Sequence, residues 1–191
     1  APNSYLSSAS CIALAGADIV FADVADDMNL DPNSLVNAIS SKTRAIIPVH
    51  LTGRPAEMDP ILDIAEKHNL YVIEDSAQAI GAAYRGQKVG SFGIFGTFSM
   101  HPLKNLSAGG DAGLVTTSSE QMADWLKKAR NHGLKSRDEV EFWSMNSRLD
   151  ALQAAMLSVK IDYLEEINRI RRKNADRYNN ELGQVVKVPA Y

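Results

Sequence analysis

Cysteine is nearly absent from this sequence, and it is one of several scarcities that narrow the possible functions. Cys11 is the single cysteine among 191 residues, so no disulfide can form within the chain and a reducing compartment, the cytoplasm, is expected. No apolar run approaches the ~20 residues that a membrane-spanning helix needs. The 20 basic and 23 acidic residues nearly balance, which gives no electrostatic case for binding nucleic acid or a membrane surface.

Familiar ligand-binding motifs are missing as well. No Cys/His spacing fits zinc, so no metal is expected, and no glycine-rich loop has the spacing that binds dinucleotides or nucleotide phosphates. The segment 1–5 lacks an initiator methionine and the basic and apolar regions of a signal peptide. We therefore expect this chain to be a piece of a longer protein.

What the sequence does contain is an alternation of apolar strands with amphipathic helices. With 45% hydrophobic residues, the chain can bury a sizeable core. The patterns predict strands at 18–24, 44–50, 70–75, 94–99 and 113–117, a hairpin at 84–90, and helices at 7–15, 33–39, 57–68, 119–130 and 149–170. Such an alternation is typical of an α/β fold with a largely parallel sheet.

Polar residues follow the predicted strands at the ends where such sheets bind ligands. His50, Asp75 and Ser99 each end a strand, and Lys104 follows in the next loop. A carboxylate, a hydroxyl and an amine are the three groups that pyridoxal phosphate (PLP) requires, for its pyridinium nitrogen, its phosphate and its aldehyde. The sequence therefore predicts one PLP site at this edge.

Each of these residues would have a distinct task beside PLP. Asp75 would keep the ring nitrogen protonated, and Lys104 would form the Schiff base and then act as base and acid. Ser99 would bind the phosphate, and Gln78 could reach the ring oxygen. Plainer interpretations remain open at this point: Asp75 as a structural carboxylate, Gln78 as a capping amide, Ser99 as a strand-end cap.

Four motifs together resemble a known family, the sugar aminotransferases of the DegT–StrS type. These motifs are Val72–Ala79, Phe98–Leu106, Gly110–Gly113 and Asn146–Ala155. The resemblance covers essentially the whole chain. It implies a PLP-dependent fold type I enzyme with a three-layer α/β/α large domain. Such enzymes are usually homodimers that aminate keto-sugar nucleotides, with L-glutamate as the common donor, for amino-sugar, surface-polysaccharide or secondary-metabolite biosynthesis.

The resemblance also assigns roles to individual residues. It makes Lys104 the Schiff-base lysine and Asp75 the partner of the pyridinium nitrogen. Gln78 would contact the phenolic oxygen of the cofactor, and Ser99 its phosphate. Tyr5 falls where the family places an aromatic residue that stacks on the pyridine ring.

Asn146 matches an asparagine that reaches the phosphate in the neighbouring subunit, which implies a dimer with shared sites. The form of the sequence around Asn146 is similar to members that act on 3-keto sugars. The resemblance further implies two domains. Residues 1–170 would form the PLP-binding large domain without its N-terminal part, and 171–191 would begin a small C-terminal domain that is mostly missing.

Two other functions stay open for this fold. One is a sugar dehydratase, although relatives of that kind carry histidine where the Schiff-base lysine belongs, so Lys104 argues against it. The other is a non-catalytic, PLP-binding regulatory protein acting as a sensor or scaffold. Retention of Asp75, Gln78, Ser99 and Lys104 together argues against that loss of chemistry.

Overall fold

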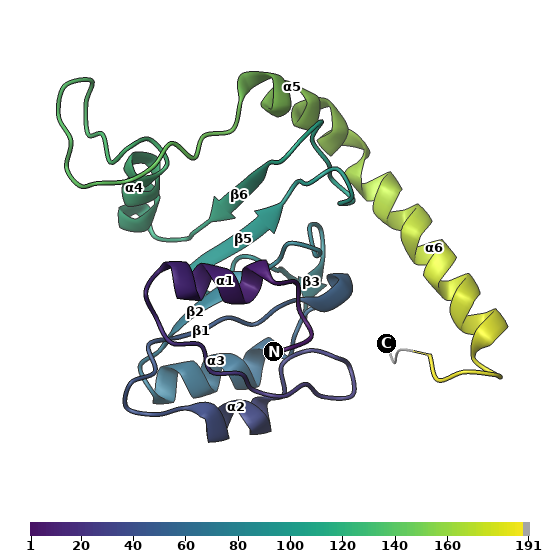
Figure 1. Ribbon diagram of the computed structural model, residues 1–191. Coiled ribbons are helices and arrows are strands. Elements are labelled where there is room, and N and C mark those ends of the chain that lie inside the picture. The colour runs from purple at the N-terminus through teal and green to yellow at the C-terminus, as the bar shows by residue number, and fades with distance from the viewer. Residues whose placement is uncertain (189–191) are drawn as a thin grey trace.

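A computed structural model describes residues 1–188, which are organised around a four-stranded sheet (Figure 1). In spatial order the strands are β1 (Ala45–Ile46), β2 (Tyr71–Asp75), β5 (Phe95–Ser99) and β6 (Gly113–Thr116). The first three run parallel, and β6 is antiparallel to β5. Strands β3 (Ala83–Tyr84) and β4 (Gln87–Lys88) form the predicted hairpin. The expected α/β fold with a mostly parallel sheet is confirmed.

The described residues also form six α-helices. They are α1 (Ser7–Leu14), α2 (Pro32–Ala38), α3 (Met58–Lys67), α4 (Glu120–Ala129), α5 (Ala151–Lys160) and α6 (Leu164–Leu182). Short 3-10 turns lie at Leu51–Gly53 (η1) and Ile161–Tyr163 (η2). The start of α2 follows its sequence signal, because the Asp31 carboxylate accepts a hydrogen bond from the backbone N–H of Asn33 at 2.9 Å. Ser119 caps α4 in the same way.

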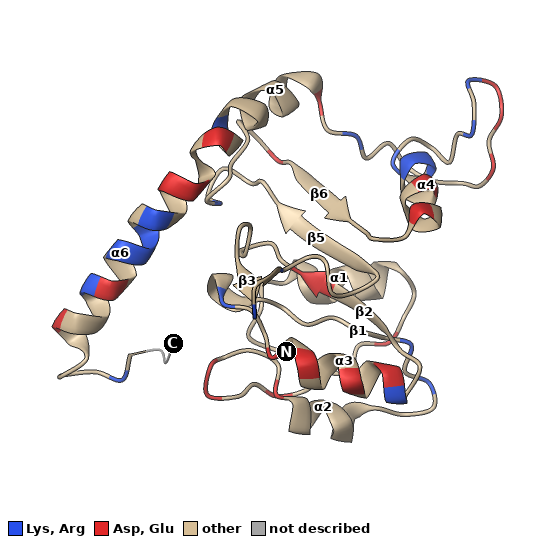
Figure 2. Cartoon of the chain, turned by 180° about the vertical axis from the view of Figure 1, so that it is seen from behind, with Lys and Arg blue, Asp and Glu red and all other residues tan. Residues whose placement is uncertain are grey.

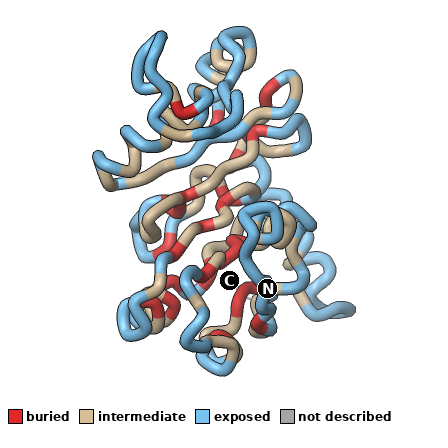
Figure 3. Tube along the Cα trace, turned by 60° about the vertical axis from the view of Figure 1, so that its left-hand side comes forward, coloured by how far each residue is buried: buried red, intermediate tan, exposed pale blue. Residues whose placement is uncertain are grey.

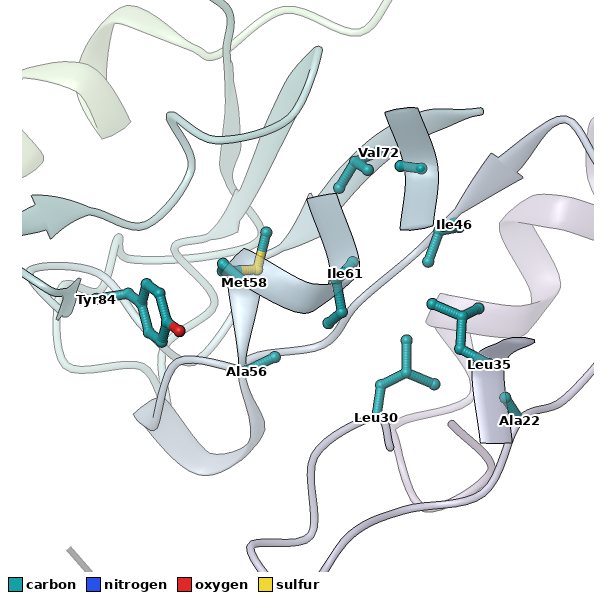
Figure 4. Packing of buried hydrophobic residues seen from close by; sticks show 10 residues of the cluster. Ala22, Leu30, Leu35, Ile46, Ala56, Met58, Ile61, Val72 and Tyr84 are labelled. Carbon is teal, nitrogen blue, oxygen red and sulfur yellow. The ribbon is translucent and has the colours of Figure 1, made fainter. Parts of the chain in front are cut away.

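Alternation along β2 determines which helices cover which face of the sheet. Val72 points into the main core, where it joins residues of α2 and α3 such as Leu35 and Ile61 (Figure 4). Asp75 lies three positions further on and therefore points to the opposite face. There its carboxylate meets Ser8 of α1. The sheet is thus covered by α3 on one face and α1 on the other.

A second, smaller core lies under the segment that follows β5. It consists of Met100, Leu106, Ala108 and Leu164, each at most 9% exposed. Leu164 is the first residue of α6, so this helix is fixed to the body at its N-terminal end. Figure 3 shows that buried positions concentrate along the middle of the trace, whereas the outer loops are exposed.

Two expectations about elements are wrong. Residues 18–24 form no strand: only an isolated bridge, Val24 to Leu30, is present, and Val20 and Phe21 are exposed without a neighbouring strand to pair with. The predicted helix 149–170 is instead two helices separated by η2, and the second continues to Leu182. Its expected stripe includes Leu152 and Val159, which are 82% and 64% exposed.

Strand β1 is shorter than the predicted strand 44–50. Its pairing with β2 lapses after Ile46 and resumes at Val49, which bridges to Asp75. Pro48 lies in this gap, and proline has no N–H to donate to a ladder. Its carbonyl still accepts from the Asp75 N–H at 2.9 Å, which keeps the two chains in register up to the end of β2.

Helix α6 extends away from the sheet and carries charges of both signs along its length (Figure 2). Arg169 pairs with Glu166 one turn earlier, as expected of a solvated helix face. No helix within residues 1–188 is both long enough and apolar enough to cross a membrane. The predicted domain boundary after residue 170 falls inside α6 and remains a prediction; residues 189–191 of the predicted C-terminal domain lie outside the described part of the chain.

Candidate functional site

The carboxyl end of β2 presents Asp75, a half-buried carboxylate. Its backbone is held on both sides of the peptide, by its N–H to Pro48 and by its carbonyl, which accepts from the N–H of His50 at 3.0 Å. Its side-chain oxygen Oδ1 accepts from the backbone N–H of Ala77 at 3.1 Å. This Asx-type turn fixes the direction of the carboxylate relative to the strand.

Ser8 is a site residue that sequence reasoning missed. Its hydroxyl donates to Oδ2 of Asp75 at 2.6 Å, and Ser4 Oγ lies 2.8 Å from Ser8 Oγ. Ser4 lies just before α1 and Ser8 in its first turn, but a contact between residues 67 positions apart cannot be detected in a single sequence. Both oxygens of the Asp75 carboxylate are therefore oriented by the protein.

Ser99 and Lys104 follow on the neighbouring strand. Because β2 and β5 are parallel, with Asp75 opposite Thr97, Ser99 ends β5 at the same edge of the sheet as Asp75. Ser99 Oγ accepts from the backbone N–H of His101 at 3.3 Å, which leaves its own hydroxyl hydrogen free to donate.

Lys104 lies in the turn after β5, where its backbone N–H donates to the His101 carbonyl at 2.8 Å. Its side chain is half-buried. Among residues 1–188, no hydrogen bond or ion pair reaches its ammonium group. A lysine held in a tight turn with an unpaired amine is available for chemistry, in contrast to Lys160, whose amine donates to the carbonyl of Ser107 at 2.6 Å.

Gln78 lies three residues after Asp75, and Tyr5 lies three residues before Ser8. Both side chains are exposed. Gln78 belongs to a series of turns after β2, so it does not cap a helix there. Tyr5 is 78% exposed, and its carbonyl accepts from the N–H of Ser8, the residue that contacts Asp75. The structure thus brings Tyr5 within one turn of the Asp75 contact and leaves its ring unburied.

Asn146 is not brought to this edge within the chain. It lies on the exposed excursion that connects α4 to α5, where a bridge to Asn131 and a hydrogen bond from Arg148 hold it. Figure 1 shows this excursion extending from α4 away from the body of the molecule. Nothing among the described residues joins Asn146 to Asp75, Ser99 or Lys104.

His50 follows the isolated bridge at Val49 rather than ending a strand, and its side chain is enclosed in the core and does not join the candidate site. It is fully buried; Nδ1 accepts from the N–H of Ala56 at 3.0 Å, and Nε2 lies 3.1 Å from Oε2 of Glu74. An acceptor at Nδ1 assigns the ring proton to Nε2, which donates to the carboxylate. His50 is therefore a structural residue.

Glu74 is the second residue that the sequence did not reveal. Its carboxylate is fully buried and accepts from the backbone N–H groups of Gly90, Phe92 and Gly93 at 2.6–2.9 Å, as well as from His50. Burial alone would raise the pKa of Glu74, but these four hydrogen bonds outweigh it and hold the pKa below its ordinary value. The buried charge is fully satisfied and ties three segments together.

The residues at the edge of β2 and β5 fit the groups of PLP. An oriented carboxylate with no cationic partner among the described residues suits a protonated ring nitrogen, and a serine with a free hydroxyl hydrogen suits a phosphate. An unpaired primary amine suits an aldehyde. The donor set is that of a cofactor site rather than a metal site, since it offers a single carboxylate at this edge.

Comparison with known proteins extends this picture. The model of the DegT/DnrJ/EryC1/StrS aminotransferase family matches residues 1–190. A "Pleiotropic regulatory protein" of Geobacillus stearothermophilus is 44% identical over 184 residues, covering 96% of this chain and 50% of that protein. A UDP-N-acetyl-3-dehydro-alpha-D-glucosamine 3-aminotransferase of Acidithiobacillus ferrooxidans is 43% identical, covering 94% and 49%.

A solved structure is similarly close. DesV of S. venezuelae, crystallised in complex with a ketimine intermediate, superposes with a TM-score of 0.91 at 39% identity, over 94% of this chain and 48% of that one. The chain spans about half the length of the curated relatives it matches.

Proposed function

Because this chain belongs to the DegT/DnrJ/EryC1/StrS aminotransferase family, we propose that the protein is a PLP-dependent aminotransferase. It moves an amino group from an amino acid, L-glutamate, to a keto-sugar nucleotide in the biosynthesis of amino sugars. The similarity to a UDP-sugar 3-aminotransferase supports both the sugar-nucleotide substrate and a keto group at carbon 3. The similarity to DesV, solved with a ketimine, supports the joining of an amine to a ketone.

One observation carries the proposal. Asp75 and Ser99 end two adjacent parallel strands at the same edge, and the unpaired amine of Lys104 follows in the next turn. Three groups of the required chemistry thus come from two elements that the sheet holds in fixed register.

The residues of the chain divide the work of binding and proton transfer. When bound, PLP supplies an aldehyde and an electron-accepting ring. Asp75, oriented by Ser8, would hold the proton on the ring nitrogen, and Ser99 would bind the phosphate. Lys104 would hold the cofactor through its amine, and Nζ, once released, would take a proton from the substrate carbon and return it.

Two exposed residues complete the proposed cofactor contacts. Gln78 would bind the ring oxygen, and the Tyr5 ring would stack on the cofactor. The exposure of the Tyr5 ring supports this role, because an aromatic residue without a packing partner in the chain is free to stack on a ligand.

The test is to fix the cofactor onto its lysine in the intact protein. After incubation with PLP and reduction with borohydride, mass spectrometry should find the phosphopyridoxyl group on Lys104 and not on Lys88, an exposed lysine that serves as the internal control. The variant Lys104→Ala should lose the adduct and amino transfer from 15N-labelled glutamate. An unlabelled Lys104 in the wild-type protein would refute the proposal.

A regulatory function is the second candidate, because one relative is named a pleiotropic regulatory protein. The two functions differ in turnover: a regulator would form the adduct on Lys104 without passing 15N from glutamate to a keto-sugar nucleotide. A sugar dehydratase would instead release water and leave the label on glutamate.

We further propose that the protein is a homodimer in the cytoplasm and that Asn146 binds the phosphate in the partner's site. The placement of Asn146 on an exposed excursion supports this arrangement, because an excursion away from the body can reach a second subunit. Exposed apolar side chains along the same part of the chain, including Trp143 at 94% and Met145 at 76%, support burial against a partner.

A further inference from the structure

A closed set of hydrogen bonds joins the segment after Lys104 to two other parts of the molecule. The side-chain amide of Asn105 donates to the carbonyl of Ile80 at 3.1 Å and to Oδ1 of Asn168 at 2.8 Å. The amide of Asn168 donates to the same Ile80 carbonyl at 3.3 Å. We call this set the asparagine junction; it links the turn of Lys104, the turns after β2 and helix α6.

The junction is close-packed around its glycine. Gly81 has a φ of +87°, and a Cβ there would lie 2.6 Å from Nδ2 of Asn168. A side chain at position 81 would therefore both strain the backbone and displace the Asn168 amide. Asn168 itself is only 8% exposed, although it lies on a helix whose surface is otherwise largely charged. A buried asparagine with its partners in place is costly to disturb, because removing one partner leaves a polar group unpaired.

The asparagine junction directly adjoins residues of the candidate site. Asn105 is the residue after Lys104, and Ile80 follows Gln78 by two residues on the turns that begin at Asp75. On the inner side of the Lys104 turn, Met100 and Leu106 are buried at 1% and 3% exposure. Met100 and Leu106 anchor the turn in the smaller core. The hydrogen bonds of Asn105 attach the same turn to the segment that follows β2 and Asp75.

We propose that Asn105 and Asn168 are positioning residues that hold the Lys104 turn in place at the sheet edge that carries Asp75. This inference rests on the proposed function of the site and adds to it a role for α6. Through the hydrogen bond between Asn168 and Asn105, a shift of α6 would shift the Lys104 turn. Neither asparagine touches the cofactor.

The test is a double-mutant cycle in the intact protein. The readout is the PLP concentration at which half of Lys104 carries the borohydride-reduced adduct. Asn105→Ala and Asn168→Ala should each raise that concentration roughly tenfold, because each removes two of the three hydrogen bonds of the junction. The double variant should cost about as much as either single one, because the two side chains act through one set of bonds. Asn174→Ala, an exposed asparagine on the same helix, is the matched control and should have no effect.

A second measurement does not depend on the cofactor. In PLP-free protein, hydrogen exchange of the Lys104 backbone amide, which donates to His101, should become faster in both single variants and remain unchanged in Asn174→Ala. If Asn168→Ala fails to fold, Asn105→Ala carries the same comparison, because it removes two of the three hydrogen bonds.

The outcomes separate this inference from the proposed function. Wild-type PLP affinity in Asn105→Ala and Asn168→Ala would overturn the inference, even if their unfolding temperatures fell, since the junction would then be structural only. Absence of the Lys104 adduct in the wild-type protein would overturn the proposed function; the exchange rates alone would then decide whether the junction holds the turn, and unchanged rates would overturn that as well.

Discussion

Ser8 shows how one hydroxyl can determine the orientation of a charged group at a candidate site. It donates to Oδ2 of Asp75 at 2.6 Å, while the Ala77 N–H holds Oδ1. Hydrogen bonds to an ionised acceptor are short and stronger than neutral ones, and this one crosses from α1 to the end of β2. The carboxylate is thus prevented from rotating without being neutralised by a cation.

We expect Ser8→Ala to weaken PLP binding roughly threefold to thirtyfold, because one charge-assisted hydrogen bond is lost and the Asp75 carboxylate gains rotational freedom. Ser8→Thr keeps the hydroxyl and should bind PLP like the wild-type protein. Fluorescence titration of the PLP-free protein measures the affinity. Ser7→Ala, at an exposed neighbouring position in the same helix, is the control. Equal affinities for Ser8→Ala and Ser8→Thr would show that the hydroxyl has no such role.

At the scale of elements, Glu74 joins strand β2, the loop at 90–93 and His50 through a single buried carboxylate. Glu74 and Asp75, which are neighbours on β2, therefore have different roles. Glu74 points into the protein and stabilises the fold, whereas Asp75 points to the other face and toward the candidate site. A Glu-Asp pair at a strand end gives no indication by itself of which carboxylate is structural; only the facing of β2 decides it.

We expect Glu74→Gln to destabilise the protein by about 2–4 kcal/mol at neutral pH, because a satisfied buried charge is replaced by an amide that cannot accept all four hydrogen bonds. The pKa of Glu74 is lowered by folding from the ordinary value of 4.5. Its contribution to stability is thus fully present above that pH and is lost as the pH falls through the folded-state pKa. The difference between wild type and variant in urea unfolding should shrink below pH 4.5. A difference independent of pH would contradict this account; Glu181→Gln, on the exposed face of α6, is the control.

The elements that the sequence predicted well are those with local signals. Helix α2 has a capping aspartate and a proline at its first position, and α3 shows the buried stripe of Met58, Ile61 and Ala65 that its periodicity predicts. The strand expected at 18–24 failed because strand formation depends on a partner, which local composition does not specify. The break between α5 and α6 at η2 likewise carries no glycine or proline signal.

The residues of the candidate site also differ in whether a local sequence pattern indicates them. The placement of Asp75, Ser99 and Lys104 at one edge could be predicted because strand ends in a parallel sheet share an edge, so three local patterns imply one location. Ser8, Asn105 and Asn168 could not, since each acts through a contact with a residue far away in the sequence. His50 was misassigned because a strand-end position predicts the edge but not the direction of the side chain.

At the scale of the whole molecule, several large apolar side chains in the C-terminal part of the described chain are exposed. Leu152, Val159 and Tyr163, on α5 and η2, are 62–82% exposed, and Trp143 and Met145 lie on the excursion that carries Asn146. Exposed apolar side chains along one part of the chain are what the proposed burial against a partner requires. They lie on the same part of the chain as the one predicted site residue that does not reach the edge of β2 and β5.

The proposed sharing of sites between subunits predicts complementation. Lys104→Ala and Asn146→Ala should each be inactive as homodimers, since every site lacks either the amine or the phosphate contact. When the two are co-expressed with different affinity tags, a dimer containing one subunit of each kind has one site with both defects and one site with none. Random pairing should therefore restore about one quarter of the wild-type aminotransferase activity, and dimers purified through both tags about one half.

The control pairs Lys104→Ala with Ser99→Ala. Both residues belong to the same subunit's half of the site, so an intact site needs one subunit that supplies both. In that control each subunit carries one defect, so activity should stay absent. Recovery in both pairings, or in neither, would show that Asn146 does not act across the dimer.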